Sequence, residues 1–399
     1  MKSICVLVQN FYEIDIRVRR KAEALVAAGY SVDVLALKSK FSTGETYELN
    51  GVTVHTFELG KQRGSGLRYV YEYATFLLWC ALKIGKLMKQ KRFSVIDINT
   101  LPDFLVYAGF LAKWRGAKLL LDMHEITPEF MMSKYGYPRG KWQVRLATWL
   151  ELISMKYADH LLTINQPIDE LLMGRGLKAG KSTIIMNAAD EEIFAKALVP
   201  GAHAPREMPP KPPFLMMYHG TLTKIYGLDI AMEAYAKARA QMPGAEFWIL
   251  GGGTEQAALE ARAKELGVAD GVRFIGSVMP DEIPFWVKMS DVGVLATRQD
   301  VFLDFSFSNK LSEYIIMDKA VIVSRLRTIA HYFSEDAVLF FKPNEADSLA
   351  AQMVRMYGDP ALRQRLAQRA KVEFEPIKWQ VMKERYLALI ARLSAGRQD

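Results

Sequence analysis

The sequence predicts an α/β protein in which two domains each hold a parallel β-sheet covered by helices. The chain has 399 residues, more than a single hydrophobic core usually organises. Short apolar runs alternate with helical patterns in both halves, the order typical of parallel sheets with helices on both faces. A segment with six prolines, 198–213, interrupts this alternation and is typical of a linker.

In the first half the alternation begins with a buried strand at Ile4–Val8 and a helix at Arg17–Ala28 that Gly29 ends. Further strands are expected at Ser31–Ala36, Val52–Phe57, Val95–Ile98, Lys118–Asp122 and His160–Ile164. Further helices are expected at Tyr69–Lys89, at Phe104–Lys113 and near Val144–Tyr157. In the second half, strands are expected at Phe214–Tyr218, Glu246–Leu250, Val272–Ile275, Val292–Ala296, Ala320–Val323 and Val338–Phe341. Helical patterns lie between these strands, and the charged tail from Pro360 is helical.

These elements predict an N-terminal Rossmann-like domain over 1–195, a proline-rich linker over 196–213 and a second domain over 214–375. A last helix is expected over 376–399, and packing back on the N-terminal domain is one option for it. Open parallel sheets bind ligands at the carboxyl ends of their strands. We therefore expect the two sheets to face each other across an interdomain cleft that holds the ligand.

The composition predicts a globular protein of the reducing cytoplasm. Half of the residues are hydrophobic and 24% are charged, which excludes disordered and collagen-like chains. Cys5 and Cys80 are the two cysteines, and so wide a spacing predicts neither a disulfide framework nor a zinc site. The apolar run that follows Met1 lacks a cleavage-site pattern, so no signal peptide is expected.

The positive charge is concentrated in one segment, 61–92, which holds eight basic residues and one acid, Glu72. A nucleic-acid partner is not expected, because such proteins carry several basic stripes or a known module. The longest uncharged run in the segment, Tyr73–Leu82, has ten residues and is too short to span a bilayer. A basic helix rich in aromatic residues suits the surface of an anionic membrane. The alternative is a helix packed on the sheet with a solvated basic end.

Two glycine-bearing motifs follow strands of the second half. Gly220 and Thr221 end the first strand and open a helix, where free backbone N–H groups favour a diphosphate, and Lys224 adds a positive charge. The run Gly251–Gly253 also ends a strand and suits a loop beneath a nucleotide. A redox dinucleotide site requires a third glycine where Gln256 stands, which disfavours that class.

Two more motifs complete the set. The run 272–276 is a strand in which Arg273 and Phe274 are interpreted as structural, and the run 309–322 carries Glu313 at a helix start. Together the four runs, in this order and at this spacing over 214–345, resemble the donor domain of family 4 glycosyltransferases, the glycosyl transferases group 1. That resemblance implies the GT-B fold, with two facing Rossmann-like domains, and a nucleoside diphosphate sugar as the donor.

The resemblance also implies roles for individual residues. Glu313 binds the ribose hydroxyls of the donor, and a loop and first helical turn bind its phosphates. That donor-binding set comprises Gly220, Thr221, Leu222, Gly251, Gly252, Gly253, Arg298, Asp304, Ser308, Asn309, Lys310 and Leu311. His124, at the end of a strand, lies over the donor sugar, although a lone histidine is also common as a structural residue. His124, Lys224 and Glu313 are thus the predicted catalytic residues.

The sequence departs from the family at several positions. Family members pair two glutamates eight positions apart, whereas Phe305 stands eight before Glu313, and Asp304 is the nearest acid. Thr221 and Tyr226 stand where relatives often carry Arg and Lys. Lys224 and Arg298 are interpreted as substitutes for the lost positive charge.

On the acceptor side, Asp15 and Arg17 lie in the loop after the first strand and match an Asp-x-Arg pattern found near the start of a relative, so they are predicted to line the acceptor site. The alternative is that Asp15 is an ordinary helix N-cap and Arg17 a surface arginine. Glu129 is included with them. The turn around Asn187, Asp190 and Phe194 is interpreted as structural.

The expected reaction is metal-independent sugar transfer from a UDP- or GDP-sugar to a hydroxyl acceptor, with retention of configuration and no cofactor. The expected acceptor is a lipid-linked glycan in cell-surface polysaccharide synthesis, and the expected location is the inner face of the cytoplasmic membrane. Two alternatives are a nucleotide-sugar epimerase of the same fold and a non-catalytic, membrane-associated protein that binds nucleotide sugars.

Overall fold

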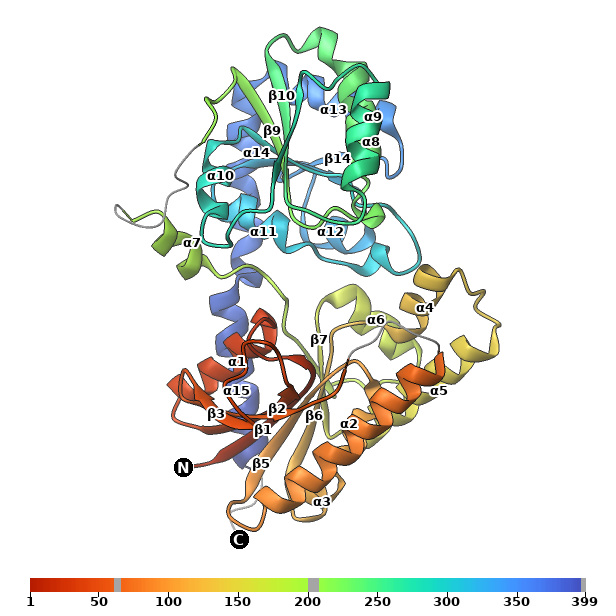
Figure 1. The fold of residues 1–399 in the computed structure, drawn as a ribbon, viewed down its shortest axis with the longest axis vertical. Helices are drawn as coiled ribbons and strands as arrows, with labels where there is room; N and C mark the ends of the chain where they lie inside the picture. The colour runs from red at the N-terminus through yellow and green to blue at the C-terminus, as the bar shows by residue number, and fades with distance from the viewer. Residues whose placement is uncertain (61–65, 200–207, 396–399) are drawn as a thin grey trace. The chain divides into compact units, whose positions relative to one another are not determined.

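The computed structural model describes residues 1–60, 66–199 and 208–395 (Figure 1). The described chain divides into two compact units, one formed by 1–186 with 382–399 and the other by 187–381. Parts of three predicted segments lie outside the described residues: 61–65 of the basic segment, 200–207 of the linker and 396–399 of the last helix. The N-terminal segment of the first unit ends at residue 186, nine residues before the predicted boundary at 195, and the chain returns to this unit at residue 382.

The sheet of the first unit has the order β3-β4-β2-β1-β5-β6-β7-β8, and β3 alone runs antiparallel to its neighbour. Its strands are β1 (Ser3–Phe11), β2 (Ser31–Leu37), β3 (Thr46–Leu49), β4 (Val52–Phe57), β5 (Phe93–Asn99), β6 (Lys118–Met123), β7 (His160–Thr163) and β8 (Ser182–Ile184). Its helices are α1 (Ile16–Ala27), α2 (Gly66–Leu87), the 3-10 helix η1 (Asp103–Gly109), α3 (Phe110–Trp114), α4 (Thr127–Tyr135), α5 (Trp142–Tyr157) and α6 (Gln166–Gly174).

The central strands of this sheet are buried, as their apolar runs predict. Every residue from Ser3 to Leu7 is buried, because helices cover both faces. The helix α2 contacts β1 and η1, and η1 contacts β5, β6 and α5, so these helices cover one face. The last helix, α15 (Trp379–Ala395), extends into the first unit, where Tyr386 is buried and bonds to a residue of β5.

The second unit has a fully parallel sheet of order β11-β10-β9-β12-β13-β14. Its strands are β9 (Phe214–His219), β10 (Ala245–Leu250), β11 (Val272–Gly276), β12 (Val292–Leu295), β13 (Ala320–Ser324) and β14 (Leu339–Phe341). Its helices are α7 (Glu191–Ala197), α8 (Leu228–Ala238), α9 (Gln256–Glu265), α10 (Ile283–Met289), α11 (Asn309–Ile316), α12 (Arg327–Tyr332), α13 (Ala346–Gly358) and α14 (Pro360–Phe374). It also holds 3-10 turns at Lys224–Tyr226, Arg239–Gln241, Leu303–Phe305 and Glu375–Ile377. The expectation of two parallel-sheet α/β domains is confirmed.

No helix in the described ranges is long and apolar enough to cross a membrane.

Candidate functional site

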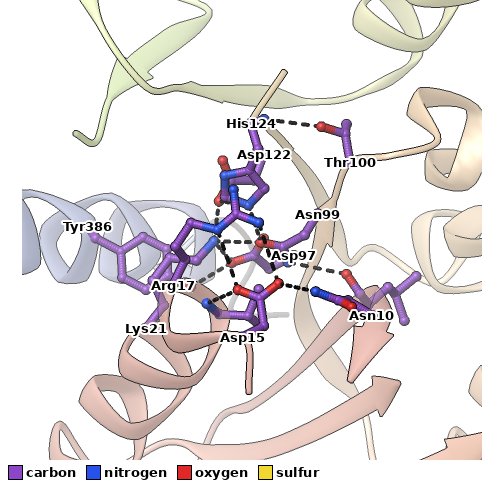
Figure 2. Close-up of polar contacts among 12 residues, drawn as sticks. Asn10, Asp15, Arg17, Lys21, Asp97, Asn99, Thr100, Asp122, His124 and Tyr386 are labelled. Atoms are coloured by element: carbon purple, nitrogen blue, oxygen red, sulfur yellow. Dashed lines mark hydrogen bonds and ion pairs between the residues drawn. The ribbon is translucent and has the colours of Figure 1, made fainter. Parts of the chain in front are cut away.

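A buried ionic cluster lies at the carboxyl ends of β5 and β6 in the first unit (Figure 2). Asn99 pairs with Asp122 in the sheet, and Asp97 precedes Asn99 by two residues, so all three side chains leave the same face. Lys21 of α1 reaches them: its Nζ lies 2.9 Å from Asn99 Oδ1 and 3.4 Å from Asp97 Oδ2, and it forms an ion pair with Asp122. Since buried charges are costly unless paired, Lys21 is what makes two buried carboxylates tolerable here.

His124, just beyond β6, bonds to this cluster through one ring nitrogen. Its Nε2 lies 3.0 Å from Asn99 Oδ1, and its backbone N–H donates to Thr100 Oγ1. The amide nitrogen of Asn99 donates to Leu7 O at 3.2 Å, which leaves Oδ1 facing His124. Because an amide oxygen only accepts hydrogen bonds, His124 carries its hydrogen on Nε2 and a lone pair on Nδ1.

Burial and nearby cations keep the His124 imidazole neutral. Burial lowers its pKa well below 6.5, and the positive charges of Arg17 and Lys21 lower the pKa further. His124 Nδ1 has no hydrogen-bond partner among the residues described. A neutral ring with an unpaired acceptor nitrogen is suited to contacting a hydroxyl or a developing positive charge, and poorly suited to donating a proton.

A pocket of about 400 Å³ lies beside this cluster, with walls from β1, α1, α2 and the loops after β5 and β6. His124, Asp15 and Arg17, three of the predicted residues, line it together. Asp15 caps α1 by accepting from Val18 N, so the alternative N-cap role is real and coexists with the pocket. Burial alone raises the pKa of Asp15, but Arg17 and Asn10 outweigh it and lower that pKa, so Asp15 is ionised at neutral pH.

Glu129 does not lie among these lining residues. It is buried on α4 and forms an ion pair with Arg175, which also donates to Glu151 Oε1 at 2.8 Å. The structure thus places Glu129 in a separate ionic cluster that joins α4, α5 and α6. Arg175 engages Oε1 of Glu129, while Oε2 is buried without a hydrogen-bond partner among the described residues, and the acceptor-side role of Glu129 stays a prediction.

In the second unit, the glycine motifs bring two loops together backbone to backbone. Gly220 N donates to Leu250 O, and Leu222 N donates to Gly252 O at 3.0 Å. Gly251 has a φ of 126°, and a Cβ there would collide with Gly220 O; a Cβ at Gly253 would collide with Leu222 O. These glycines are therefore required by chain packing, whatever ligand the loops bind.

Lys310, in the first turn of α11, packs over the Gly220 loop. Its Nζ lies 4.0 Å from the centre of the Tyr226 ring and 5.5 Å from that of Tyr218. Its aliphatic stem fills the space where a side chain at Gly220 would stand. Burial lowers the pKa of Lys310 to about 8, the charge of Glu313 opposing that shift. No carboxylate within the described ranges forms an ion pair with Lys310, so this charge is available to an anion.

Glu313 is held by a histidine that the sequence analysis did not select. His219 ends β9, is buried, and contacts Glu313 Oε2 through Nε2. Its other nitrogen, Nδ1, lies 3.2 Å from the hydroxyl of Tyr314. The position of His219, directly before Gly220 at the end of a strand, was the signal that would have found it.

Several other predicted donor residues are engaged within the protein. Asp304 Oδ1 accepts from Arg327 N at 2.9 Å and from Gln299 Nε2, so this acid holds the start of α12. Arg298 forms an ion pair with Asp229 and donates to Lys224 O. Lys224 itself is exposed at the start of a 3-10 turn.

The remaining predicted residues surround the start of α11 and the loop after β9. Ser308 is the N-cap of α11 but makes no side-chain capping bond, which leaves the first-turn amides without a side-chain cap. Leu222 and Leu311 are buried, Thr221 is exposed, and Asn309 Oδ1 is buried without a partner among the described residues. No group of three or more His, Cys, Asp or Glu side chains in the described ranges is placed to hold a metal ion.

Solved structures share this fold over nearly the whole chain. Sucrose-phosphate synthase from Thermosynechococcus elongatus is 18% identical, with all of both chains covered and a TM-score of 0.76. HepE from Anabaena, solved in complex with UDP, is 14% identical with a TM-score of 0.71, covering 98% of this chain and 100% of that one. The same protein has also been solved with UDP-glucose.

Sequence comparisons assign both halves of the chain. Glycogen synthase from Mycobacterium tuberculosis is 26% identical over 229 residues, 56% of this chain, and the chain spans about half (50%) of that relative's length. Residues 14–188 match the glycosyl transferase 4-like domain, and residues 203–373 match the glycosyl transferases group 1. The two matches follow one another along the sequence and together cover most of it. The chain belongs to the glycosyl transferases group 1.

Proposed function

We propose that this glycosyltransferase moves a sugar from a UDP- or GDP-sugar to a hydroxyl acceptor, with retention of configuration and without a metal ion. The observation that carries the proposal is the arrangement of Lys310 and Glu313 around the Gly220 loop. Lys310, which has no ion-pair partner among the residues that the structure describes, and the carboxylate of Glu313 lie one helical turn apart on α11, beside backbone amides without a side-chain cap. HepE, which has the same fold, has been solved with UDP and UDP-glucose, which supports a nucleotide sugar as the donor.

In the proposed reaction, the acceptor hydroxyl attacks the anomeric carbon from the side of the leaving diphosphate. The bond from that carbon to the phosphate oxygen breaks as the new glycosidic bond forms, and the phosphate takes the hydroxyl proton. The protein positions the reactants and stabilises the leaving charge. Lys310 and the first-turn amides of α11 supply that stabilisation, Glu313 accepts hydrogen bonds from the ribose, and His124 contacts the donor sugar.

A donor screen tests the proposal. The purified full chain is incubated with UDP-, GDP- and ADP-sugars and a lipid extract, and released nucleoside diphosphate is quantified. We expect release that needs one donor and the lipid, and that falls by orders of magnitude in Glu313→Ala. Glu265→Ala, which removes an exposed glutamate from α9 of the same unit, serves as the matched control and keeps wild-type turnover.

The screen also separates the two alternatives. Phe305 stands at the place of the first family glutamate, and its neighbour Asp304 accepts hydrogen bonds from Arg327 and Gln299, which favours the non-catalytic binding protein as the second candidate. Tight UDP or GDP binding without release from any donor would establish that candidate. An epimerase would convert the donor sugar without any acceptor.

We further propose that the acceptor is a lipid-linked glycan for cell-surface polysaccharide and that the protein lies on the inner face of the cytoplasmic membrane. The support is a set of exposed apolar side chains on three helices of the first unit, which we call the aromatic surface. It consists of Val70, Tyr71, Leu78 and Leu82 on α2, Phe110, Leu111 and Trp114 on α3, and Trp142, Leu146 and Trp149 on α5. The same helices carry basic residues, among them Lys83 and Lys86 on α2 and Arg145 on α5, and Arg115 directly follows α3.

The helix α2 contributes side chains to both this surface and the pocket wall. Tyr69 and Tyr73 of α2 line the pocket, while Tyr71, Leu78 and Leu82 of the same helix face outward. Tryptophan side chains favour the membrane interface, and each basic residue near an anionic surface contributes about 1 kcal/mol. A lipid-linked acceptor held at that surface would enter the pocket from the membrane side.

Replacing Trp114 and Trp149 by serine is expected to weaken binding to anionic vesicles about tenfold or more, because both indoles leave the interface. Trp114 is 79% exposed and Trp149 is 55% exposed, so the fold is expected to tolerate both changes. Vesicle co-sedimentation with phosphatidylglycerol and phosphatidylcholine measures the effect. Phe41→Ser, which removes a comparably exposed aromatic residue elsewhere in the unit, is the control. Equal binding by all three proteins would refute the membrane proposal and leave the donor proposal intact.

A further inference from the structure

The hydrogen bonds around His219 determine which of its ring nitrogens carry hydrogen. Tyr314 Oη lies 2.7 Å from Met217 O, a carbonyl that only accepts, so the single hydroxyl hydrogen of Tyr314 points there. Toward His219 Nδ1, at 3.2 Å, the tyrosine oxygen can then offer only a lone pair. Nδ1 therefore carries a hydrogen.

The second nitrogen faces a carboxylate. His219 Nε2 contacts Glu313 Oε2, and an ionised carboxylate has no hydrogen to donate. The proton between Nε2 and Oε2 is thus held by the pair, in addition to the hydrogen on Nδ1. His219 and Glu313 together form a charge-neutral, hydrogen-bonded pair whose histidine is buried and whose glutamate is one-fifth exposed.

This arrangement fixes the direction of the glutamate. With Oε2 bound to His219, the Glu313 side chain cannot rotate freely, and Oε1 makes no hydrogen bond to any described residue. The other ionisable groups near the pair are Tyr314 and Lys310 on α11 and Tyr218 on β9. Within the described ranges none of them forms a hydrogen bond or an ion pair with Oε1, which leaves that oxygen for a ligand.

We infer that His219 is a positioning residue for nucleotide recognition: through the hydrogen bond between Nε2 and Oε2 it orients Glu313 so that the carboxylate receives the ribose hydroxyls of a nucleoside diphosphate. The inference rests on the proposed function, because it assumes that this site binds the donor nucleotide. His219 is not among the residues to which the family resemblance gives a role. In this inference the His219–Glu313 pair discriminates ribose from deoxyribose.

The binding test uses the full chain and four probes, UDP, GDP and their 2′-deoxy counterparts, with affinities from calorimetry. We expect the wild type to bind the preferred ribonucleotide at least about tenfold more tightly than its 2′-deoxy form, since a lost hydroxyl leaves Glu313 unsatisfied. In His219→Leu that ratio is expected to fall to near one. His219→Gln, whose amide N–H still reaches a carboxylate, is expected to keep most of it.

The second readout needs no ligand, so the inference and the proposed function can fail separately. In protein labelled with ¹⁵N-histidine, the His219 ring, assigned from the spectrum of His219→Gln, is expected to carry a hydrogen on Nδ1 and to show Nε2 in a hydrogen bond. In Glu313→Gln the Nε2 signal is expected to shift, because that hydrogen bond changes. A His219 ring without a hydrogen on Nδ1, or a ribose preference unchanged in His219→Leu, would overturn the inference; failure of the wild type to bind any probe would instead overturn the proposed function.

Discussion

Replacing Lys310 by methionine is expected to stabilise the second unit while weakening the binding of nucleoside diphosphates by about 10- to 100-fold. Lys310 is a cation with no ion-pair partner within the described ranges, and burial lowers its pKa from 10.5 to about 8. A folded-state pKa below the unfolded value means that the charged amine opposes folding. Methionine fills a similar volume without that charge, so we expect a gain on the order of 2 kcal/mol at pH 7.

The pH dependence distinguishes this mechanism from simple repacking. The penalty for the charged amine is complete below pH 8 and disappears as the pH rises through 8 toward 10.5, because the folded protein loses the proton first. The stabilisation in Lys310→Met should therefore shrink over the same range. The binding defect should shrink as well, because the wild type then loses the charge that contacts the diphosphate.

The free energy of unfolding of the second unit is measured by hydrogen exchange of the β9 and α11 amides in increasing denaturant. Calorimetry with UDP and GDP measures the nucleotide affinity. Lys264→Met on α9, an exposed lysine of the same unit, is the control and should change neither quantity. If Lys310→Met is less stable than the wild type, the buried charge of Lys310 does not destabilise the folded state. Unchanged affinity would remove Lys310 from the phosphate site.

Much of the architecture could be predicted from the sequence because the apolar runs are long and the sheets are parallel. The expected central strands, from Ile4–Val8 to Val338–Phe341, match strands of the structure to within a few residues. The short strands β3 and β8 have partly exposed or intermediate residues, so they lack the apolar run that identifies a buried strand. The expected helix at Phe104–Lys113 is a 3-10 helix followed by a short α-helix, since periodicity does not separate the two types.

The site was harder to predict, because its polar side chains gain their roles from partners distant in sequence. Asp15, Arg17 and His124 were selected from their places after strands, and the structure brings them to one pocket. Glu129 was grouped with them, but it does not line the pocket and forms an ion pair with Arg175, 46 residues away in the sequence. Lys21 lies in a helical pattern with other polar residues, and nothing near it in the sequence marks it as buried. Its partner Asp97 lies 76 residues further along the chain.

The Lys21→Met variant is expected to show the largest loss of stability, about 3 to 5 kcal/mol at pH 7. The change leaves Asp97 and Asp122 buried next to each other without a cation. Burial and the charge of Asp122 already raise the pKa of Asp97, and Lys21 is what counteracts them. Hydrogen exchange of β1, β5 and β6 amides in the full chain reports this unit alone, and Lys89→Met, an exposed lysine beyond α2, is the control.

The direction of the pH effect tests the cause of that loss. Without Lys21, the pKa of Asp97, which burial already raises, is expected to rise further above its unfolded value, so the variant should gain stability relative to the wild type as the pH falls from 7 toward 4. Adding Asp122→Asn should restore part of the loss by removing one buried charge, while a loss that is independent of pH and of Asp122 would mean that packing, not charge, is responsible. Because Lys21 also holds Asn99, whose oxygen holds His124, the charge that stabilises the sheet is the same one that orients the pocket histidine. Loss of stability and disordering of the His124 ring should therefore appear together in Lys21→Met, whereas the double variant should recover stability without recovering the order of the ring, because it still lacks the contact from Lys21 to Asn99.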